Sequence, residues 1–476
     1  MKSKKFTAAL LIIQLLLSVL MAVLVFKLNI LPTKYVAIFL AVLAAFILIL
    51  FAINHRIKKG KKSRLFLDIV IILINISLLM GNYYFYRSYN ALAQLTAGSN
   101  SQTHTLNLRV LDESETENVE DLAGKTIEYS SQVTTEYNGQ YVSQLEKQVD
   151  CDFMEVTTFQ QLIDDLYSGK CDAIILEEAY EGFLEVLHPD YQNETRVIDT
   201  YEFQEEVEEV VEEKENNGDS FSVFISGIDT YGAINTVSRS DVNMVMTVNT
   251  KTNEILLTSI PRDYYVTLHT YGVKDKFTHT GVYGINETIT TAEDFLDINI
   301  DYYVRVNFTS LIDIIDAIGG ISIYNSIAFT NRGYSFPVGQ ISMSGAQALV
   351  YARERYAYTD GDNQRIKNQQ TIITGIINKA MSPAILTNYT NFLDVVMNSC
   401  QTNIPTDVVT AIVKNQLERG ESWNIEHQYL TGSGSHSKTT FSMPGWNLYV
   451  MVPNQSSVDA ASANIKTVED GGTPDL

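Results

Sequence analysis

RERYAYTDGDNQRIKNQQ, residues 353–370, gathers three arginines into one short segment. If the first part of this segment is extended, the i, i+2 spacing of Arg353 and Arg355 points both guanidinium groups to one side. The DGDN motif that follows is typical of a turn and can also cap a helix. In the helix that would begin there, Arg365 and Gln369 are four residues apart and therefore share a face.

This pattern indicates an anion-binding site. Planar guanidinium groups that converge on one point suit an anion with several equivalent oxygens, meaning a phosphate or a pyrophosphate. The carboxamides of Gln369 and Gln370 close the segment. The alternative is a surface patch in which the arginines pair with nearby acids, and the segment alone leaves both interpretations open.

The charge of the chain is distributed unevenly. Its 476 residues carry a net charge of −22, and the length allows two or three domains. The first 90 residues hold 12 of the 34 Lys and Arg but only one acid, Asp68, so the remainder carries a net charge of −33. Such a domain should not bind nucleic acid through a general positive field, and a cluster of arginines inside it needs a local reason.

Three almost uncharged apolar segments near the N-terminus have the length of about 20 residues that crosses a bilayer: Phe6–Phe26, Tyr35–Ile53 and Leu65–Phe85. The first could be a signal peptide, but no small-residue cleavage site follows it and two more spans do. Lysines at the N-terminus and the basic loop HRIKKGKKSR put both of these segments in the cytoplasm. We therefore expect a multi-pass protein of the cell membrane whose later domains are extracytoplasmic.

The remaining sequence predicts two domains of mixed α/β type. The expected divisions are a membrane anchor over residues 1–90, a polar linker over 91–105, a small accessory α/β domain over 106–200, an acidic helical linker over 201–218, a larger α/β domain over 219–470 and a tail over 471–476. The acidic linker is read as a helix with a solvated face and not as a calcium site.

The accessory domain carries the motifs DLAGKTI and LYSGKCDAIIL, which resemble one lobe of a periplasmic solute-binding protein. We find no cluster of polar residues in this domain that indicates a particular ligand, so we favour a spacer or interaction domain. Cys151 and Cys171 could form a disulfide, but free thiols are an equal alternative. The three cysteines show no metal-type spacing.

The larger domain begins with three strand-like segments, Phe221–Ile228, Val242–Val248 and Glu254–Ile260. If they pair antiparallel, then the end of the first, the start of the second and the end of the third lie at one edge, where α/β sheets usually bind ligands. The charged residues that this arrangement gathers at that edge are Asp229, Arg239, Asp241 and Arg262.

Two aspartates beside several arginines make chemical sense around a pyrophosphate. A Mg²⁺ or Mn²⁺ ion held by Asp229 and Asp241 could bridge its oxygens while guanidinium groups neutralise the remaining charge. The alternative is that both aspartates simply pair with neighbouring arginines. Lys276 is a further candidate phosphate contact, whereas a lone His279 is more often structural. The apolar helix expected at Phe308–Ile318 could be ordinary core or could wall a groove for a lipid tail.

These pieces together resemble the LytR-CpsA-Psr family, in its capsule-associated branch, over about residues 219–470. The motifs that carry the resemblance are GID, RSD, SIPRD, KDKFTH, NFTSLIDIIDAIGGI, RERY and DGDNQRIKNQQ, in this order. The resemblance implies an α-β-α domain with a mixed central sheet flanked by helices. It also implies binding of polyprenyl pyrophosphate lipids through arginines, with Mg²⁺ at the carboxylates.

Carried over by motif, Asp229 and Asp241 would be the metal ligands. The head group would be held by Arg239, Arg262, Arg353, Arg355, Arg365 and Gln369, with Lys276 as an additional contact. Many relatives carry arginine where this chain has Lys367, which loses a bidentate contact. Gln364 stands where relatives often have an acid, so a third carboxylate is missing there.

The expected function is that of a membrane-anchored phosphotransferase. It would attach undecaprenyl-pyrophosphate-linked capsular polysaccharide to peptidoglycan, with Asp229, Arg239, Asp241 and Arg262 as the catalytic residues. Its partners would be the membrane and capsule assembly proteins, and not nucleic acid. Two alternatives remain: a non-enzymatic membrane regulator of capsule synthesis, and a hydrolase that cleaves the same pyrophosphate with water.

Overall fold

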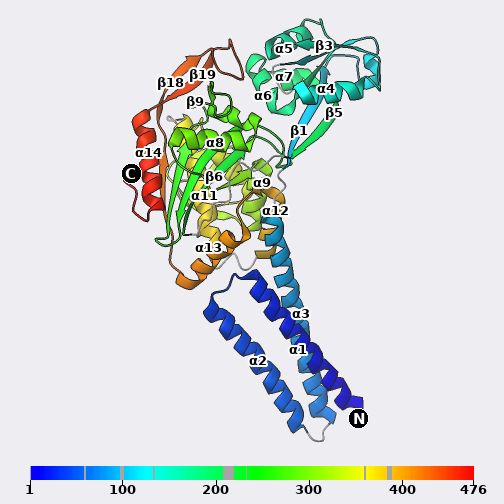
Figure 1. Cartoon of the computed structure of the whole chain (residues 1–476), viewed down its shortest axis with the longest axis vertical. Coiled ribbons are helices and arrows are strands. Elements are labelled where there is room, and N and C mark those ends of the chain that lie inside the picture. The colour runs from blue at the N-terminus through cyan, green and yellow to red at the C-terminus, as the bar shows by residue number, and fades with distance from the viewer. Residues whose placement is uncertain are drawn as a thin grey trace.

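The computed structural model describes residues 2–57, 61–96, 101–131, 135–206, 219–231, 233–358, 361–382 and 389–476. A shaft of long helices carries a large domain, and a smaller domain sits at the far end of the molecule (Figure 1). Most of the predicted acidic linker, residues 207–218, lies outside the described ranges.

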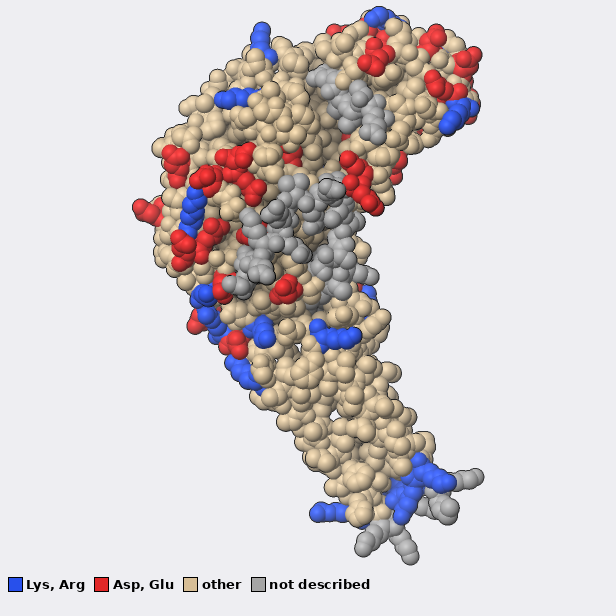
Figure 2. Space-filling view, in the orientation of Figure 1, with Lys and Arg blue, Asp and Glu red and all other residues tan. Residues whose placement is uncertain are grey.

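The shaft consists of α1 (Lys2–Leu28), α2 (Thr33–Arg56) and α3 (Lys61–Thr96). Each helix contains an apolar stretch long enough to cross a membrane, which confirms the three predicted spans. The surface of the shaft has an uncharged middle, and basic side chains gather at its free end (Figure 2). Asp68, the one acid of the first 90 residues, is buried between α1 and α3 and accepts a hydrogen bond from Thr7 Oγ1 at 2.7 Å.

The third helix is longer than its apolar span. It reaches Thr96 and packs against α12 (Tyr389–Ser399) of the large domain, where Arg87 Nη2 lies 2.7 Å from Asp394 Oδ2. The predicted linker over residues 91–105 is therefore wrong in its first part, which continues this helix.

The accessory domain is a five-stranded sheet in the order β3-β2-β4-β1-β5, with its edge strand β5 antiparallel to β1. Its elements are β1 (Ser101–Leu111), η1 (Val119–Leu122), β2 (Thr126–Ser130), α4 (Thr135–Leu145), β3 (Asp152–Val156), α5 (Phe159–Tyr167), β4 (Ala173–Glu177), α6 (Glu178–Leu187), α7 (Tyr191–Glu194) and β5 (Thr195–Glu206). The cysteines at 151 and 171 are free thiols.

The domain extends beyond both predicted boundaries, residues 106 and 200, because β1 and β5 pair along their whole length. Ser101 pairs with Glu206 and the ladder runs on from there, so residues 101–105 are strand and not linker, and residues 201–206 are strand and not helix. Tyr201 and Phe203 alternate with more polar neighbours and pack on the core of the domain. Pairing with a strand almost a hundred residues earlier decides their conformation over local helical spacing.

The large domain is built on a mixed six-stranded sheet in the order β16-β11-β6-β7-β8-β17. Its strands are β6 (Ser220–Ile228), β7 (Ser240–Asn249), β8 (Glu254–Ile260), β11 (Tyr302–Val306), β16 (Gln401–Thr402) and β17 (Asn424–Tyr429). The strands β6, β7 and β8 are consecutive and antiparallel, as predicted, while β11 and β17 add to them in parallel.

Helices cover both faces of this sheet, which confirms the predicted α-β-α architecture. Phe224, Val245 and Leu256 point to one face and share a core with α8 (Ile285–Leu296) and α14 (Gln455–Glu469). The opposite face packs on a second group of helices, namely α9 (Phe308–Ala317), α10 (Gly345–Arg353), α11 (Gly361–Ala380) and α13 (Thr406–Arg419).

Short elements surround the two layers of helices. They are β9 (Tyr265–Thr267), β10 (Lys274–Lys276), η2 (Phe277–Tyr283), β12 (Ile321–Asn325), β13 (Phe329–Asn331), β14 (Tyr334–Phe336), β15 (Gly339–Met343), β18 (Gly432–Ser437) and β19 (Leu448–Pro453).

Candidate functional site

The strand register brings the predicted edge residues together. Asp229 follows the end of β6, Asp241 is the second residue of β7, and Arg262 comes two residues after β8. Ile228 pairs with Ser240, and the β7–β8 ladder ends at the pair Asn243 and Ile260. Because antiparallel neighbours meet at this edge, the two carboxylates and the arginine lie within one small region.

Asp241 is the more firmly held of the two carboxylates. Its Oδ2 accepts a hydrogen bond from Arg262 Nη1 at 2.8 Å, and its Oδ1 accepts one from Thr278 Oγ1 at 2.9 Å. Burial opposes ionisation, but the charges of three arginines, with Arg262 first among them, and the Thr278 hydrogen bond outweigh it and lower the pKa of Asp241. This residue is an anion at neutral pH.

Asp229 is held more loosely. Arg353 Nη2 lies 3.8 Å from Oδ1, and Arg239 Nη2 lies 4.0 Å from Oδ2, both beyond ordinary hydrogen-bond distance. Burial and the negative charge of Asp241 raise the pKa of Asp229, against the opposing effect of the arginines. Two neighbouring carboxylates in one site thus differ in their affinity for a proton.

The arginine-rich segment supplies one wall of the site, with one change from the expected conformation. Arg353 is the last residue of α10, a helix capped at its start by Ser344, so it does not lie on an extended strand. Arg355 follows the helix, whereas Arg365 and Gln369 belong to α11. The side chains of all four line the same cavity as Asp229 and Asp241.

Gln370 points the other way. Its amide donates to the carbonyl oxygens of Leu257 and Gln428 at 3.2 and 2.7 Å, and it is almost fully buried. It joins α11 to the sheet, and of the two carboxamides it is Gln369 that lines the cavity.

The cavity has a volume of about 300 Å³ and is lined by both polar and apolar residues. Its apolar lining comes from the sheet and from three helices: Ile225, Ile228, Val242, Val306, Phe308, Leu311, Leu349, Val350, Ala352, Ile372 and Ile373. The guanidinium carbon of Arg353 lies 4.2 Å from the centre of the Phe308 ring. Helix α9 contributes to both the cavity and the core, since Phe308 and Leu311 line the cavity while Ile315 lies in the core.

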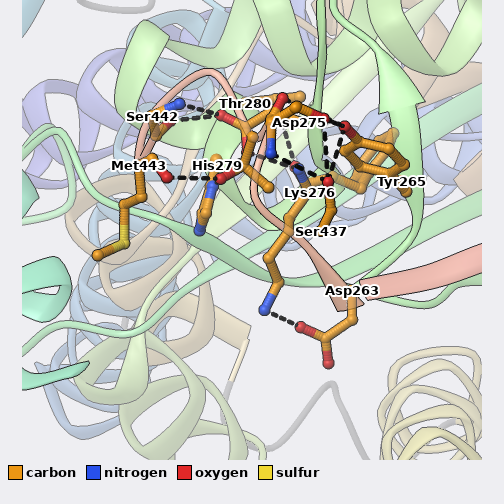
Figure 3. Close-up of polar contacts among 12 residues, drawn as sticks. Asp263, Tyr265, Asp275, Lys276, His279, Thr280, Ser437, Ser442 and Met443 are labelled. Atoms are coloured by element: carbon orange, nitrogen blue, oxygen red, sulfur yellow. Dashed lines mark hydrogen bonds and ion pairs between the residues drawn. The ribbon is translucent and has the colours of Figure 1, made fainter. Parts of the chain in front are cut away.

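Two predicted contacts lie outside the cavity lining. Arg239 borders Asp229 but is not among the lining residues. Lys276 forms an ion pair with Asp263, which also lies 3.7 Å from Arg262 Nε (Figure 3). The amine of Lys276 is therefore directed to a carboxylate beside the site, and the structure does not bring it to the cavity as a phosphate contact.

His279 is structural, as expected. Its Nδ1 lies 2.7 Å from the fully buried Asp275, whose other oxygen accepts from the Ser442 backbone (Figure 3). Lys367 lies 5.3 Å from the Tyr429 ring, and the amide of Gln364 donates to Asn368 at 3.1 Å.

Among the lining residues that sequence reasoning missed are Asn331, at the end of β13, and Arg332, in the turn that leads to β14. Arg332 has a left-handed backbone with φ 48°. The single sequence holds no motif that would have placed this turn beside the arginine-rich segment.

The donor set fits a small hard cation. Mg²⁺ is usually bound by one or two carboxylates together with substrate phosphate oxygens, and Asp229 and Asp241 provide two carboxylates beside an arginine-lined space. Within the described ranges no group of three or more His, Cys, Asp or Glu side chains is arranged for a metal.

The family model of the LytR_cpsA_psr family matches residues 188–466, which is more than half of the chain. The chain belongs to the LytR-CpsA-Psr family. Over 221 residues, this LytR-CpsA-Psr protein is 37% identical to the polyisoprenyl-teichoic acid–peptidoglycan teichoic acid transferase TagU of Bacillus subtilis. The matched region is 46% of this chain and 71% of the relative. The transferase of the same name from Bacillus licheniformis is 34% identical over 252 residues, covering 53% and 78% of the two chains.

Among solved structures, the crystal structure of Bacillus subtilis TagU covers 54% of this chain and 99% of its own, with 32% identity and a TM-score of 0.42. The names of the two curated relatives describe transferases that act between a polyisoprenyl-linked glycopolymer and peptidoglycan. That class is the enzyme class predicted from the sequence.

Proposed function

We propose that this protein transfers a capsular polysaccharide from undecaprenyl pyrophosphate to peptidoglycan at the outer face of the cell membrane. The observation that carries the proposal is the cavity, because apolar side chains and several arginines line one space, which matches a lipid tail joined to a pyrophosphate. A free sugar phosphate would not need the apolar lining, and an uncharged lipid would not need the five lining arginines.

In the proposed reaction, a hydroxyl oxygen of peptidoglycan attacks the phosphorus that is bonded to the glycan. The bond from this phosphorus to the bridging oxygen breaks, undecaprenyl phosphate leaves, and the glycan is joined to peptidoglycan through a phosphodiester. The hydroxyl proton passes to a base that the residues described above do not identify. Catalysis of this kind depends mainly on positioning and on stabilisation of charge.

The residues would divide this work. Arg353, Arg355 and Arg365 would hold the phosphate oxygens, with Gln369 as a neutral donor. Arg262 would keep Asp241 ionised and in place through their hydrogen bond at 2.8 Å. Asp229 and Asp241 would hold Mg²⁺ or Mn²⁺, and such an ion would neutralise charge that develops on the pyrophosphate.

The basic end of the helical shaft is proposed to face the cytoplasm, which puts both folded domains outside. The donor lipid lies in the same membrane as the three spans. It could therefore enter the cavity without leaving the bilayer surface completely.

Reconstitution tests the proposal. The full chain, purified in detergent, is mixed with a lipid-linked glycan labelled at the glycan-bound phosphate, Mg²⁺ and peptidoglycan. The label should become attached to peptidoglycan, and undecaprenyl phosphate should appear in equal amount. Label released into solution in the presence of the acceptor would instead identify a pyrophosphate hydrolase, and unaltered donor would favour the regulator.

Asp241→Asn is the matched active-site variant, because it keeps the shape of the side chain and removes its charge. It should abolish transfer while the protein stays folded. Full transfer by this variant would refute the proposed site, even if the chain proved to be a transferase.

A further inference from the structure

The accessory domain packs directly against residues 235–237 of the large domain, the segment that precedes Arg239. Thr103 of β1 exchanges backbone hydrogen bonds with this segment, donating to Asn235 at 2.9 Å and accepting from Val237 at 3.1 Å. Val237 is buried in the same hydrophobic cluster as Phe183 and Leu184 of α6. The contact therefore joins the two domains immediately before Arg239.

A second contact lies just beside the first. The ring of Phe183 meets the ring of His279 edge-on, with 4.7 Å between the ring centres. Val282 and Met443 of the large domain complete this part of the cluster. An interface with a buried apolar core and backbone hydrogen bonds fixes α6 relative to the active-site strands more firmly than a tethered spacer domain would be fixed.

Gly182 lies in this interface, in the middle of α6. A Cβ atom placed on it would lie 2.6 Å from Cζ of Arg239 and 2.7 and 2.8 Å from the two terminal nitrogens. Because the three distances are nearly equal, the flat guanidinium group lies face-on against the helix backbone. Nη2 of the same guanidinium group lies 4.0 Å from Oδ2 of Asp229.

The backbone does not explain a glycine at this position. Gly182 is helical and is not among the glycines with positive φ, and glycine in a helix interior costs about 1 kcal/mol relative to alanine. A larger side chain at position 182 would not fit, because the guanidinium group of Arg239 occupies the space next to Gly182.

We propose that α6 of the accessory domain positions Arg239 against Asp229 through the glycine at 182, so that the head-group site is completed across the domain boundary. The proposal rests on the proposed function in taking Asp229 as part of the pyrophosphate site. Gly182 is a positioning residue, and the accessory domain contributes to the active site in place of binding a solute of its own.

Gly182→Ala is a mild but specific test. The new methyl group meets only the far end of a flexible side chain, so the fold can accept it by moving the guanidinium, and alanine favours the helix. Gly139→Ala is the matched control, because Gly139 is a helical glycine of the same domain whose Cβ would meet nothing within 4 Å.

The experiment measures the affinity of the full chain in detergent for farnesyl pyrophosphate with Mg²⁺. Gly182→Ala and Arg239→Ala should each weaken binding about 10-fold, as expected for one charged contact at a partly exposed site. The double variant should bind no more weakly than Arg239→Ala, because both changes act on one guanidinium. Gly139→Ala should bind like the unaltered protein. If Gly182→Ala binds as tightly as the unaltered protein while Arg239→Ala binds more weakly, the inference about Gly182 is overturned. The proposed pyrophosphate site would then still stand.

A second measurement does not depend on the ligand. The rate at which phenylglyoxal modifies Arg239, followed by peptide mass spectrometry, should rise in Gly182→Ala and stay unchanged in Gly139→Ala. If the unaltered chain fails to bind farnesyl pyrophosphate, the proposed function fails. The modification rate then still decides whether Gly182 positions Arg239, and an unchanged rate would exclude it.

Discussion

Arg353→Ala should separate the binding of the pyrophosphate from the stability of the fold. In the absence of ligand, the guanidinium lies 3.8 Å from Asp229, and its side chain is 41% exposed. An ion pair of this kind contributes about 0–1 kcal/mol to stability. Stacking on Phe308 at 4.2 Å adds about 0.5–1 kcal/mol. The variant should therefore remain folded, with a melting temperature only a few degrees lower.

The loss of binding should be much larger. A charge-assisted hydrogen bond from Arg353 to a phosphate oxygen contributes about 1.5–3 kcal/mol, which corresponds to a roughly 10- to 150-fold weaker Kd when it is lost. Calorimetric titration of the full chain with farnesyl pyrophosphate measures this change, and thermal unfolding of the same samples measures stability.

Arg419→Ala provides the control for the loss of a positive charge. Arg419 donates to the carbonyl oxygens of Thr250 and Lys251, at the end of helix α13, and does not line the cavity. Its removal should leave the Kd unchanged. An Arg353→Ala variant that binds farnesyl pyrophosphate as tightly as the unaltered chain would refute the assignment of this segment to the head group.

Three further predictions follow from the same contacts. Leu311→Trp narrows the apolar part of the cavity, so it should weaken binding of farnesyl pyrophosphate more than binding of the five-carbon dimethylallyl pyrophosphate, as measured by competition. Lys276→Met removes the ion-pair partner of Asp263 but no cavity-lining group, so transfer should fall only a few-fold in the reconstituted assay, and complete loss would restore Lys276 as a direct ligand. The pKa of His104 is raised because hydrogen bonds and charge from Glu177 and a second glutamate outweigh the opposing effect of burial. A raised pKa stabilises the fold below the ordinary value of about 6.5 and loses this effect as pH rises through the folded-state pKa, so the melting temperature should fall between pH 6 and 8 in the unaltered chain and fall less in His104→Gln.

The parts of the fold that follow local patterns could be predicted from the sequence. Three apolar spans and the strands β6, β7 and β8 with their hairpin needed no knowledge of distant residues, and they were enough to gather Asp229, Asp241 and Arg262. The conformation of residues 201–206 depends on pairing with β1 and could not be read locally.

The helical spacing within the arginine-rich segment could also be read from the sequence. Arg365 and Gln369 are four residues apart and share a face of α11, and both line the cavity. Gln370, turned about 100° away from Gln369, binds to the sheet instead. The ion pair of Lys276 could not be predicted, because its partner Asp263 lies on another segment, next to Arg262.

The acidic character of the two folded domains raises the question of how the proposed site would attract a pyrophosphate. The chain beyond residue 90 carries a net charge of −33, but at physiological ionic strength such a field is screened over about 8 Å. The arginines that line the cavity would act at much shorter range and in a partly buried space, where screening is weak. A donor held in a membrane, as we propose, would also need no long-range steering through bulk solvent. Because α12 packs against both α3 and the cavity helix α9, an anchor formed by α3 would hold the cavity near the membrane surface.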